Sequence, residues 1–399
     1  MSRRPELREG RHQTSSAACR AERPAALRHS LKLLHAFSTF AIGGSQIRFA
    51  QLANALSERL EHVVVSMDGA RGAERLVSPN VRLRLRAVAA RKGGGLSLAN
   101  LRTFRSVLRE ERPDLLLSYN WGAIEWALAD RLRPICPHLH VVDGFGLEEA
   151  ARQLPRRIWL RRLALAGSTT VVVPSQSLRK TAIETWQLDP GRVRHIPNGV
   201  DTAALAEEAR KPLGLRRHPD ERLFGTLAGL RAEKNLGRLL RIAAMLPQNR
   251  PWRLIIAGEG AQRAALEALA RDFGLAARVA FIGHVDRPRS VLCELDVFVL
   301  TSDTEQMPIS VLEAMATGLP VLATDVGDLR LMLPPTSGAT CLFGHAAEEA
   351  FAERLGALLE APDERKRLGA LNRERASAFT VEAMVARYDR LLRELIAAG

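Results

Sequence analysis

The chain has 399 residues, which is too long for one ordinary domain and enough for two domains of roughly 150–200 residues each. Hydrophobic residues make up 46% and charged residues 26% of the sequence, the balance of a globular protein with two sizeable cores. No apolar run approaches the ~18 residues of a membrane-spanning helix, so the composition excludes such a helix.

The net charge of +14 is unevenly distributed. Residues 1–200 hold 32 lysines and arginines against 17 aspartates and glutamates, whereas residues 201–399 hold 26 against 27. We expect the basic half to meet an anionic partner, such as a phosphate-bearing lipid, a membrane surface or nucleic acid. The alternative is that the arginine content reflects genome bias.

The chain offers neither a secretion signal nor a cysteine framework. Residues 1–30 are rich in Arg, Ala and Ser but lack the apolar core of a signal peptide, and we interpret them as a disordered basic tail or an artefact of an upstream start codon. The four cysteines lie far apart, which predicts no disulfide framework and no metal site. A reducing, cytoplasmic compartment follows.

Strand-like apolar runs alternate with amphipathic helical stretches in the first half. Strands are predicted at Leu31–Phe37, His62–Ser66, Val81–Leu85, Asp114–Ser118, His140–Val142 and Thr169–Val173. Helices are predicted from Ser45 to about Leu60 and at Leu98–Glu111, Gly122–Arg131, Pro155–Ala166 and Ser177–Trp186.

A second series follows a segment from Asp201 to Glu221 that suits an interdomain linker. Strands are predicted at Leu223–Gly229, Trp252–Gly258, Val279–Gly283, Asp296–Ser302 and Pro320–Thr324, and helices at about Asn235–Leu246, Gln262–Phe273 and Pro308–Thr317. The sequence therefore predicts an α/β protein of two doubly wound, Rossmann-like domains that face each other across a cleft. The predicted divisions are 1–30 (tail), 31–205 (acceptor-binding domain), 206–378 (donor-binding domain) and 379–399 (a closing helix that packs back on the first domain).

Two carboxylates eight residues apart, Glu305 and Glu313, give the strongest signal. Glu305 follows a predicted strand, and Glu313 would face the same cleft if its helix starts near Pro308. Carboxylates accept paired hydrogen bonds from vicinal hydroxyls, so one could hold a hexose and the other a ribose. The spacing alone is more typical of a loop acid and a helix acid that meet only water.

The segment Thr301–Gly327 resembles the signature of retaining glycosyltransferase family 4, in which such a pair of glutamates precedes an EAMA-x-GLPV-x-AT run. The resemblance implies a GT-B fold, contact of Glu305 with the donor sugar and of Glu313 with the nucleotide ribose. It also implies that Gln306, Met307 and Pro308 bind the donor. The family usually has Gly where this chain has Gln306, and Gln would be strained there if φ must be positive.

Lys234, at a strand-to-helix junction (Ala228–Asn235), is placed to meet a diphosphate. The resemblance implies that it neutralises the leaving group together with an arginine five residues earlier, but that position is Gly229. Arg231 is the candidate for the missing charge. The alternative is a basic pair on the surface.

Two glycine turns match the resemblance, and one acid departs from it. Gly43 and Gly44 follow the first strand, where glycines let a backbone approach a phosphate closely. Gly258 and Gly260 belong to a tight turn that either binds the donor or is purely structural. Asp143 stands where many family members carry a histidine near the reacting centre, so it could accept or position the acceptor proton.

The segment Arg152–Leu165 joins five arginines with six large apolar residues. It predicts a basic amphipathic helix that lies on an anionic bilayer, or an ordinary helix with a solvated basic face.

The resemblance implies a retaining, metal-independent hexosyltransferase that uses a nucleotide-diphosphate sugar as co-substrate and no cofactor. The sequence holds no D-x-D motif for a metal ion. The expected partners are the donor, a saccharide or lipid-linked acceptor and an anionic membrane surface, with no nucleic acid. The expected location is cytoplasmic, peripheral on the inner face of a bacterial plasma membrane. The alternatives are another GT-B activity, such as a sugar-nucleotide epimerase or a phosphorylase, and an inactive nucleotide-sugar-binding protein.

Overall fold

The computed structural model describes residues 30–90, 96–131, 133–149, 152–202, 205, 214–215 and 217–398. The predicted tail lies outside them except for Ser30, and the predicted linker is described only in part.

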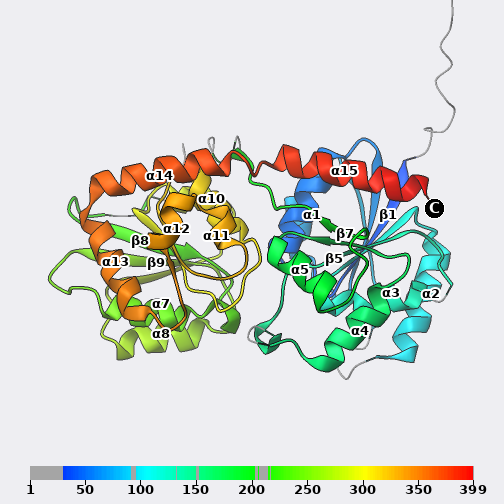
Figure 1. Ribbon diagram of the computed structural model, residues 1–399, viewed down its shortest axis with the longest axis horizontal. Coiled ribbons are helices and arrows are strands. Elements are labelled where there is room, and N and C mark those ends of the chain that lie inside the picture. The colour runs from blue at the N-terminus through cyan, green and yellow to red at the C-terminus, as the bar shows by residue number, and fades with distance from the viewer. Residues whose placement is uncertain are drawn as a thin grey trace, which may run out of the picture. The chain divides into compact units, whose positions relative to one another are not determined.

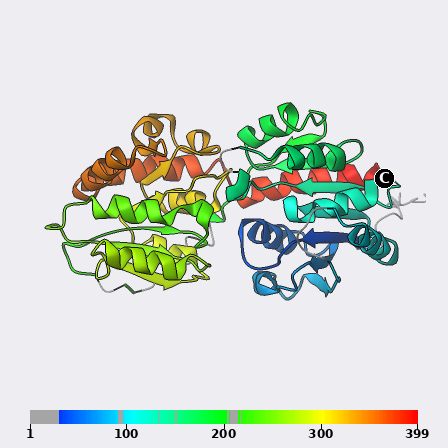
Figure 2. The same cartoon turned by 90° about the horizontal axis from the view of Figure 1, so that it is seen from below.

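Seven parallel strands form the first sheet, in the order β3-β2-β1-β4-β5-β6-β7. Their bounds are β1 Leu31–Phe37, β2 Leu60–Ser66, β3 Arg82–Arg86, β4 Leu115–Tyr119, β5 His138–Val141, β6 Thr170–Val173 and β7 Val193–His195. The central strands β4, β5 and β6 are buried throughout because helices cover both faces of the sheet, as Figures 1 and 2 show. The helices are α1 Gly44–Ala55, α2 Leu98–Glu111, α3 Ile124–Arg131, α4 Pro155–Leu165 and α5 Gln176–Glu184.

Six parallel strands form the second sheet, in the order β10-β9-β8-β11-β12-β13. Their bounds are β8 Arg222–Leu227, β9 Trp252–Ala257, β10 Val279–Gly283, β11 Val297–Leu300, β12 Val321–Thr324 and β13 Leu342–Phe343. Its helices are α7 Leu236–Ala244, α8 Arg263–Asp272, α9 Pro288–Leu292, α10 Ile309–Thr317, α11 Leu329–Met332, α12 Pro335–Cys341, α13 Glu348–Glu360 and α14 Pro362–Ala376. The two parallel sheets with alternating helices confirm the predicted fold class.

The last helix, α15 (Val381–Ala397), lies beside α1 rather than on the second sheet (Figure 1). Its buried side chains, Met384, Tyr388 and Leu391 among them, belong to the core of the first sheet. Helix α15 thus packs on the sheet that contains β1.

In each sheet the strand order reverses at one place, between β1 and β4 and between β8 and β11. Ligands of open parallel sheets bind beyond the carboxyl ends of the strands at such a reversal, since the crossover connections diverge there and leave a crevice. The candidate residues therefore have a defined location in each sheet.

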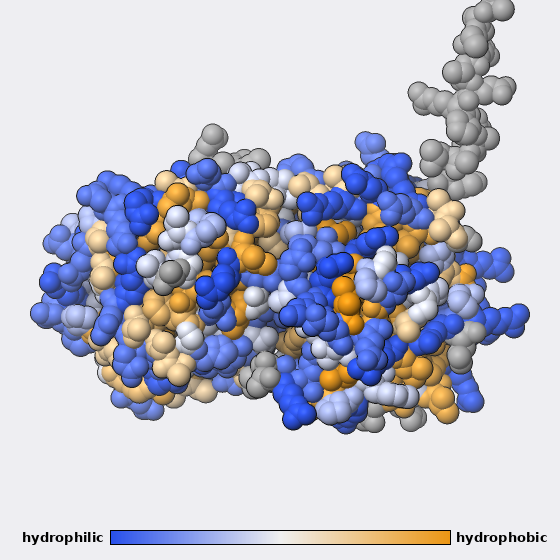
Figure 3. All heavy atoms as spheres, viewed as in Figure 1, coloured by the Kyte–Doolittle hydropathy of each residue, from blue (hydrophilic) through white to orange (hydrophobic). Residues whose placement is uncertain are grey.

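The side chains on the face seen in Figure 3 are mostly hydrophilic, with hydrophobic residues in small groups between them. Within the described residues, every helix is too short or too polar to span a bilayer.

Candidate active site

Lys234 and Glu305 meet at the strand-order reversal of the second sheet. Lys234 ends a 3₁₀ turn after β8, and Glu305 lies in the loop after β11, the strand that pairs with β8. The Lys234 Nζ lies 2.5 Å from Glu305 Oε1, and the Ser302 hydroxyl donates to the same oxygen at 2.8 Å. Both charged side chains are largely buried, at 17% and 10% exposure. The two loops thus present a close, nearly desolvated charge pair.

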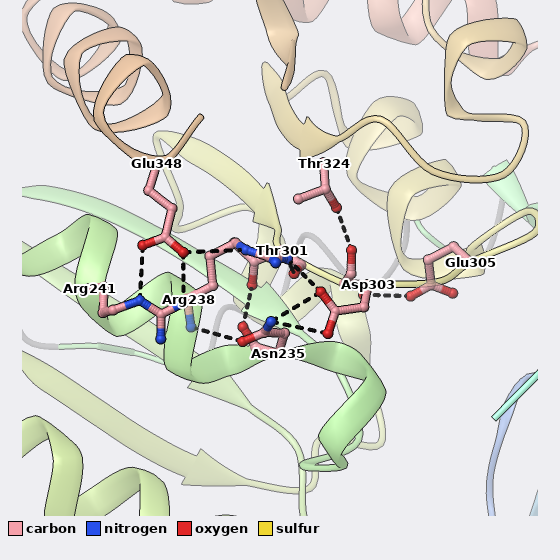
Figure 4. Close-up of polar contacts among 9 residues, drawn as sticks. Asn235, Arg238, Arg241, Thr301, Asp303, Glu305, Thr324 and Glu348 are labelled. Atoms are coloured by element: carbon pink, nitrogen blue, oxygen red, sulfur yellow. Dashed lines mark hydrogen bonds and ion pairs between the residues drawn. The ribbon is translucent and has the colours of Figure 1, made fainter. Parts of the chain in front are cut away.

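A network of hydrogen bonds and ion pairs fixes the loop that carries Glu305 (Figure 4). Asn235, in the left-handed conformation (φ 43°), caps α7 and donates its side-chain amide to both Asp303 oxygens, at 3.0 and 3.1 Å. The Arg238 guanidinium lies 2.8 Å from Asp303 Oδ1 and donates to the Thr301 carbonyl at 2.8 Å. Asn tolerates positive φ better than most residues, which explains its position at this tight junction.

The network of polar contacts extends to Glu348, the first residue of α13. Glu348 accepts two hydrogen bonds from Arg241, at 2.9 and 2.6 Å, and lies 3.5 Å from Arg238 Nε. One network, formed by Asn235, Arg238, Arg241 and Glu348, therefore holds the Asp303–Glu305 loop in place. Of these four residues, only Asn235 lay within a segment that the sequence indicated as part of the site.

Arg231 lies where a side chain at position 229 would begin. A Cβ atom at Gly229 would stand 3.3 Å from Arg231 Nε and 3.9 Å from its Cγ. The side chain is 63% exposed and contacts Glu233 at 3.1 Å. The guanidinium is thus largely open to solvent and accessible to a ligand.

Gly258 and Gly260 are required by backbone packing. Both have positive φ, at 142° and 159°, and a Cβ atom there would collide with the carbonyl oxygens of Ala228 and Leu230. Only glycine allows the β9–α8 loop to lie directly against the loop that carries Arg231 and Lys234.

The remaining donor-side candidates follow Glu305 in the chain. Gln306 does not have positive φ, so the strain considered from the sequence is absent. Its side-chain oxygen accepts a hydrogen bond from the Ser175 hydroxyl at 2.7 Å. Pro308 precedes α10, on which Glu313 is half-buried.

Met307 and Gly44 complete the donor-side residues. Met307 is buried, and its carbonyl accepts from the Asn198 side chain at 2.8 Å. Gly43 precedes α1 and Gly44 begins it, and a Cβ atom at Gly44 would lie 4.0 Å from the Ile309 side chain at the start of α10. The glycine loop of the first sheet therefore approaches the helix that carries Glu313.

Asp143, after β5, is held by a buried arginine that the sequence analysis missed. The Arg48 guanidinium, 2% exposed, lies 2.5 Å from Asp143 Oδ1 and donates to Asn198 Oδ1 at 2.9 Å. The Ser45 hydroxyl donates to the other Asp143 oxygen, and the Asp143 backbone N–H donates to Asn120 Oδ1 at 2.6 Å. Burial acts to lower the pKa of Arg48, and the Asp143 charge outweighs it and raises that pKa. Asp143 is thus engaged by protein groups on both carboxylate oxygens.

His140 is a core residue of β5, with 1% exposure. The Ser118 hydroxyl lies 2.7 Å from both His140 Nδ1 and His138 Nε2. Burial lowers the pKa of His138 to about 3 and holds that of His140 well below its usual range. This neutral pair packs inside the sheet and does not reach the site.

A cavity of about 380 Å³ opens beside Glu305. Glu305 and Gln306 line it together with Asp303 and Gly327 of the second sheet's loops, and Phe145, Glu149, Arg152 and Gln153 are among the residues that line it from the other side. In the described part of the chain, no group of three His, Cys, Asp or Glu side chains is arranged to hold a metal ion.

Two Rossmann-like sheets with charged and glycine loops at their strand-order reversals define the GT-B class of glycosyltransferase folds. Known proteins agree: residues 42–204 match the model for "Glycosyltransferase Family 4" and residues 208–375 that for "Glycosyl transferases group 1". This chain belongs to that glycosyltransferase family.

Three relatives illustrate the similarity. D-inositol 3-phosphate glycosyltransferase of Nocardia farcinica is 30% identical over 307 residues, 70% of this chain and 67% of that protein. UDP-Gal:alpha-D-GlcNAc-diphosphoundecaprenol alpha-1,3-galactosyltransferase of Escherichia coli is 26% identical over 242 residues, 57% of this chain and 62% of that one. Sucrose-phosphate synthase from Thermosynechococcus elongatus has the same fold, with a TM-score of 0.77 at 22% identity, covering 92% of this chain and all of that one.

Proposed function

We propose that the protein is a retaining, metal-independent hexosyltransferase that moves a sugar from a nucleotide-diphosphate sugar to a saccharide or lipid-linked acceptor. The observation that carries the proposal is the Lys234–Glu305 pair, 2.5 Å apart at the strand-order reversal of the second sheet, in a member of this family.

Each side chain has a defined part in this proposal. Glu305 accepts hydrogen bonds from the donor sugar hydroxyls, and Glu313 accepts them from the nucleotide ribose. Lys234 and Arg231 balance the charge that develops on the departing diphosphate, which is the largest electrostatic change in the reaction. The Gly43–Gly44 loop leaves room for a phosphate next to backbone N–H groups.

The proposed step forms a bond between the acceptor oxygen and the anomeric carbon while the bond from that carbon to the diphosphate oxygen breaks. The acceptor attacks from the face of the leaving group, and the departing diphosphate oxygen takes the acceptor proton. This route needs no protein base, which suits an Asp143 whose oxygens are engaged by Arg48 and Ser45. We assign Asp143 to positioning of the loop rather than to proton transfer.

The acceptor and the setting are inferred from chemistry and relatives. A galactosyltransferase relative is named for an acceptor on diphosphoundecaprenol, and an arginine-rich first half suits a phosphate-bearing lipid. We propose a role in cell-surface polysaccharide or lipopolysaccharide synthesis on the cytoplasmic face of the membrane.

Release of nucleoside diphosphate from UDP-, GDP- and ADP-sugars, with and without bacterial lipid extract, tests the proposal. We expect release from one donor, raised by the extract and lost in Glu305→Ala, with the α-configuration of the donor kept in the product. An inverted product would contradict the retaining mechanism, and the absence of turnover with every donor would contradict the transferase.

The same assay separates the two alternatives. A sugar-nucleotide epimerase would convert the donor sugar without any acceptor, and an inactive binding protein would bind the donor without release. Arg231, which stands beside Gly229, favours the transferase over the inactive protein because it replaces a charge that the family places there.

A further inference from the structure

Helix α4 turns three of its five neighbouring arginines inward. The Arg161 guanidinium contacts Glu149 at 2.7 Å, with 4% and 1% side-chain exposure, and Arg157 contacts the same carboxylate at 3.1 Å. Arg161 also stacks on Trp121 and Trp186, 5.1 and 5.0 Å from the ring centroids. Arg162 donates to the Thr185 carbonyl at 2.7 Å. These arginines hold the helix on the sheet and are occupied.

The outward face has a different composition. Arg152, Arg156, Trp159 and Leu163 follow one another at spacings of four, three and four residues, so from Arg156 onward they lie on one face of the helix. All four are exposed, Trp159 at 62% and Leu163 at 36%. Among the described residues no ion pair engages either Arg152 or Arg156. A row of two free cations and two large apolar side chains thus faces outward.

Exposed apolar side chains concentrate in this part of the molecule. Leu96 and Leu98, at the start of α2, are 48% and 72% exposed. Helix α2 packs on α3, which packs on α4, so the three helices form one layer. In the second half the exposed large side chains (Met245, Phe273 and Leu331) are scattered over α7, α8 and α11.

We propose that the outward face formed by Arg156, Trp159 and Leu163 of α4, with Arg152 just before the helix, docks onto the anionic headgroups of a lipid bilayer. Arginine meets lipid phosphate, while an exposed tryptophan gains most at the boundary between headgroups and acyl chains, where its ring is apolar and its N–H is wet. Nucleic acid would match the arginines but not the apolar side chains of Trp159 and Leu163.

The proposed docking face lies next to the candidate active site. Arg152 also lines the 380 Å³ cavity that contains Glu305. Docking by α4 therefore brings that cavity next to the lipid surface, where a lipid-linked acceptor is presented. The docking itself does not depend on the proposed reaction.

Co-sedimentation of the full chain with vesicles tests the proposal, using phosphatidylcholine with and without 30% phosphatidylglycerol. We expect binding to the anionic vesicles alone, weakened at least ~10-fold in Trp159→Ala/Leu163→Ala and in Arg156→Ala. The matched control, Arg271→Ala/Phe273→Ala at the end of α8, should bind as the wild type does. Binding that survives Trp159→Ala/Leu163→Ala, as binding by the arginines of residues 1–30 would, overturns the proposal.

Intrinsic fluorescence gives an independent readout without turnover. Of the five tryptophans, Trp126, Trp186 and Trp252 are buried and Trp121 is half-buried beneath Arg157 and Arg161, so Trp159 is the one with most of its surface exposed. Anionic vesicles should shift its emission to the blue, and Trp159→Phe should abolish the shift while the protein still sediments. An unchanged emission maximum with bound protein would exclude insertion of this face, as would an equal shift with DNA.

Discussion

Each sheet has a charged pair beyond the carboxyl ends of its strands, but the two pairs have different surroundings. In the second sheet, Glu305 lines a cavity and is paired with Lys234. In the first sheet, Arg48 is 2% exposed, and Asp143, with 19% side-chain exposure, contacts Ser45, Asn120 and Arg48. A ligand in the cavity can reach Glu305 directly, whereas a ligand that replaced Asp143 would leave the buried Arg48 without its charged partner. From this comparison we propose that Lys234–Glu305 takes part in the reaction and that Arg48–Asp143 supports the fold.

The largest expected effect is on stability at the enclosed pair. Arg48→Met leaves the Asp143 carboxylate without its buried partner, and removing one member of a buried pair costs about 3–5 kcal/mol. Urea unfolding should show this loss. The control Arg59→Met, at an exposed pair with Asp389, should change the free energy of unfolding by less than about 1 kcal/mol. A similar small change in Arg48→Met would mean that the pair does not support the fold.

Removing the lysine of the Lys234–Glu305 pair should mainly lower turnover. Lys234→Ala is expected to lower kcat about 100-fold, the scale of one lost contact to a transition-state charge. Some stability should be lost as well, because Glu305 is 10% exposed and loses its charged partner, so turnover is compared below the melting temperature of the variant. Lys180→Ala, at a surface pair on α5, should keep full turnover. Near-normal kcat in folded Lys234→Ala would contradict the proposed part of this side chain in the reaction.

The buried histidines predict an acid-sensitive first sheet. Burial lowers the pKa of His62 to about 4 and that of His138 to about 3, whereas in the unfolded chain both titrate near 6.5. Below about pH 6.5 the unfolded state binds more protons than the folded state. The contribution of these histidines to the free energy of unfolding is therefore complete above that pH and falls as the pH drops toward their pKa values in the folded protein. At pH 5 each histidine should cost about 2 kcal/mol relative to pH 7.5. His138→Gln should flatten the pH dependence of urea unfolding, and an unchanged slope would contradict the assignment.

The smallest effect concerns the charge beside Lys234. Arg231→Ala should lower kcat/KM about 10-fold, since the guanidinium is largely exposed and screened. Gly229→Arg/Arg231→Ala should restore most of it, because position 229 lacks positive φ and the removed side chain was its nearest neighbour. If Arg231→Ala keeps the wild-type kcat/KM and the double variant gains nothing over it, the positive charge beside Lys234 is not used in the reaction.

The sequence predicted the elements of the donor side well because its signals are local. Glu305, Gln306, Met307, Pro308 and Glu313 lie within nine residues, and the strands around them are uninterrupted apolar runs. Leu31–Phe37, Leu98–Glu111 and Val279–Gly283 were predicted with the observed bounds, and most other elements differ by one to four residues at their ends. Short or polar elements were missed, namely β7, β13 and the helices α9 and α11 to α14.

The supporting contacts were not predictable because they join distant segments. Arg48 and Asn198 are 150 residues apart, and Arg241 and Glu348 are 107 residues apart. An arginine in the first helix after Gly44 gives no sign that it will be buried against Asp143. Likewise, the pattern of Arg152–Leu165 predicted a basic helix face, either on an anionic bilayer or in solvent, while Glu149, the tryptophans and the Thr185 carbonyl engage three of its five arginines.

The most direct test of the central claim is the turnover of Glu305→Gln with its preferred donor. The substitution keeps the size of the side chain and removes the charge that meets Lys234, and Glu267→Gln on α8 serves as the control. The account predicts a loss of about 100-fold in nucleoside diphosphate release, with the melting temperature within a few degrees of the wild type. Near-normal release from folded Glu305→Gln would contradict it.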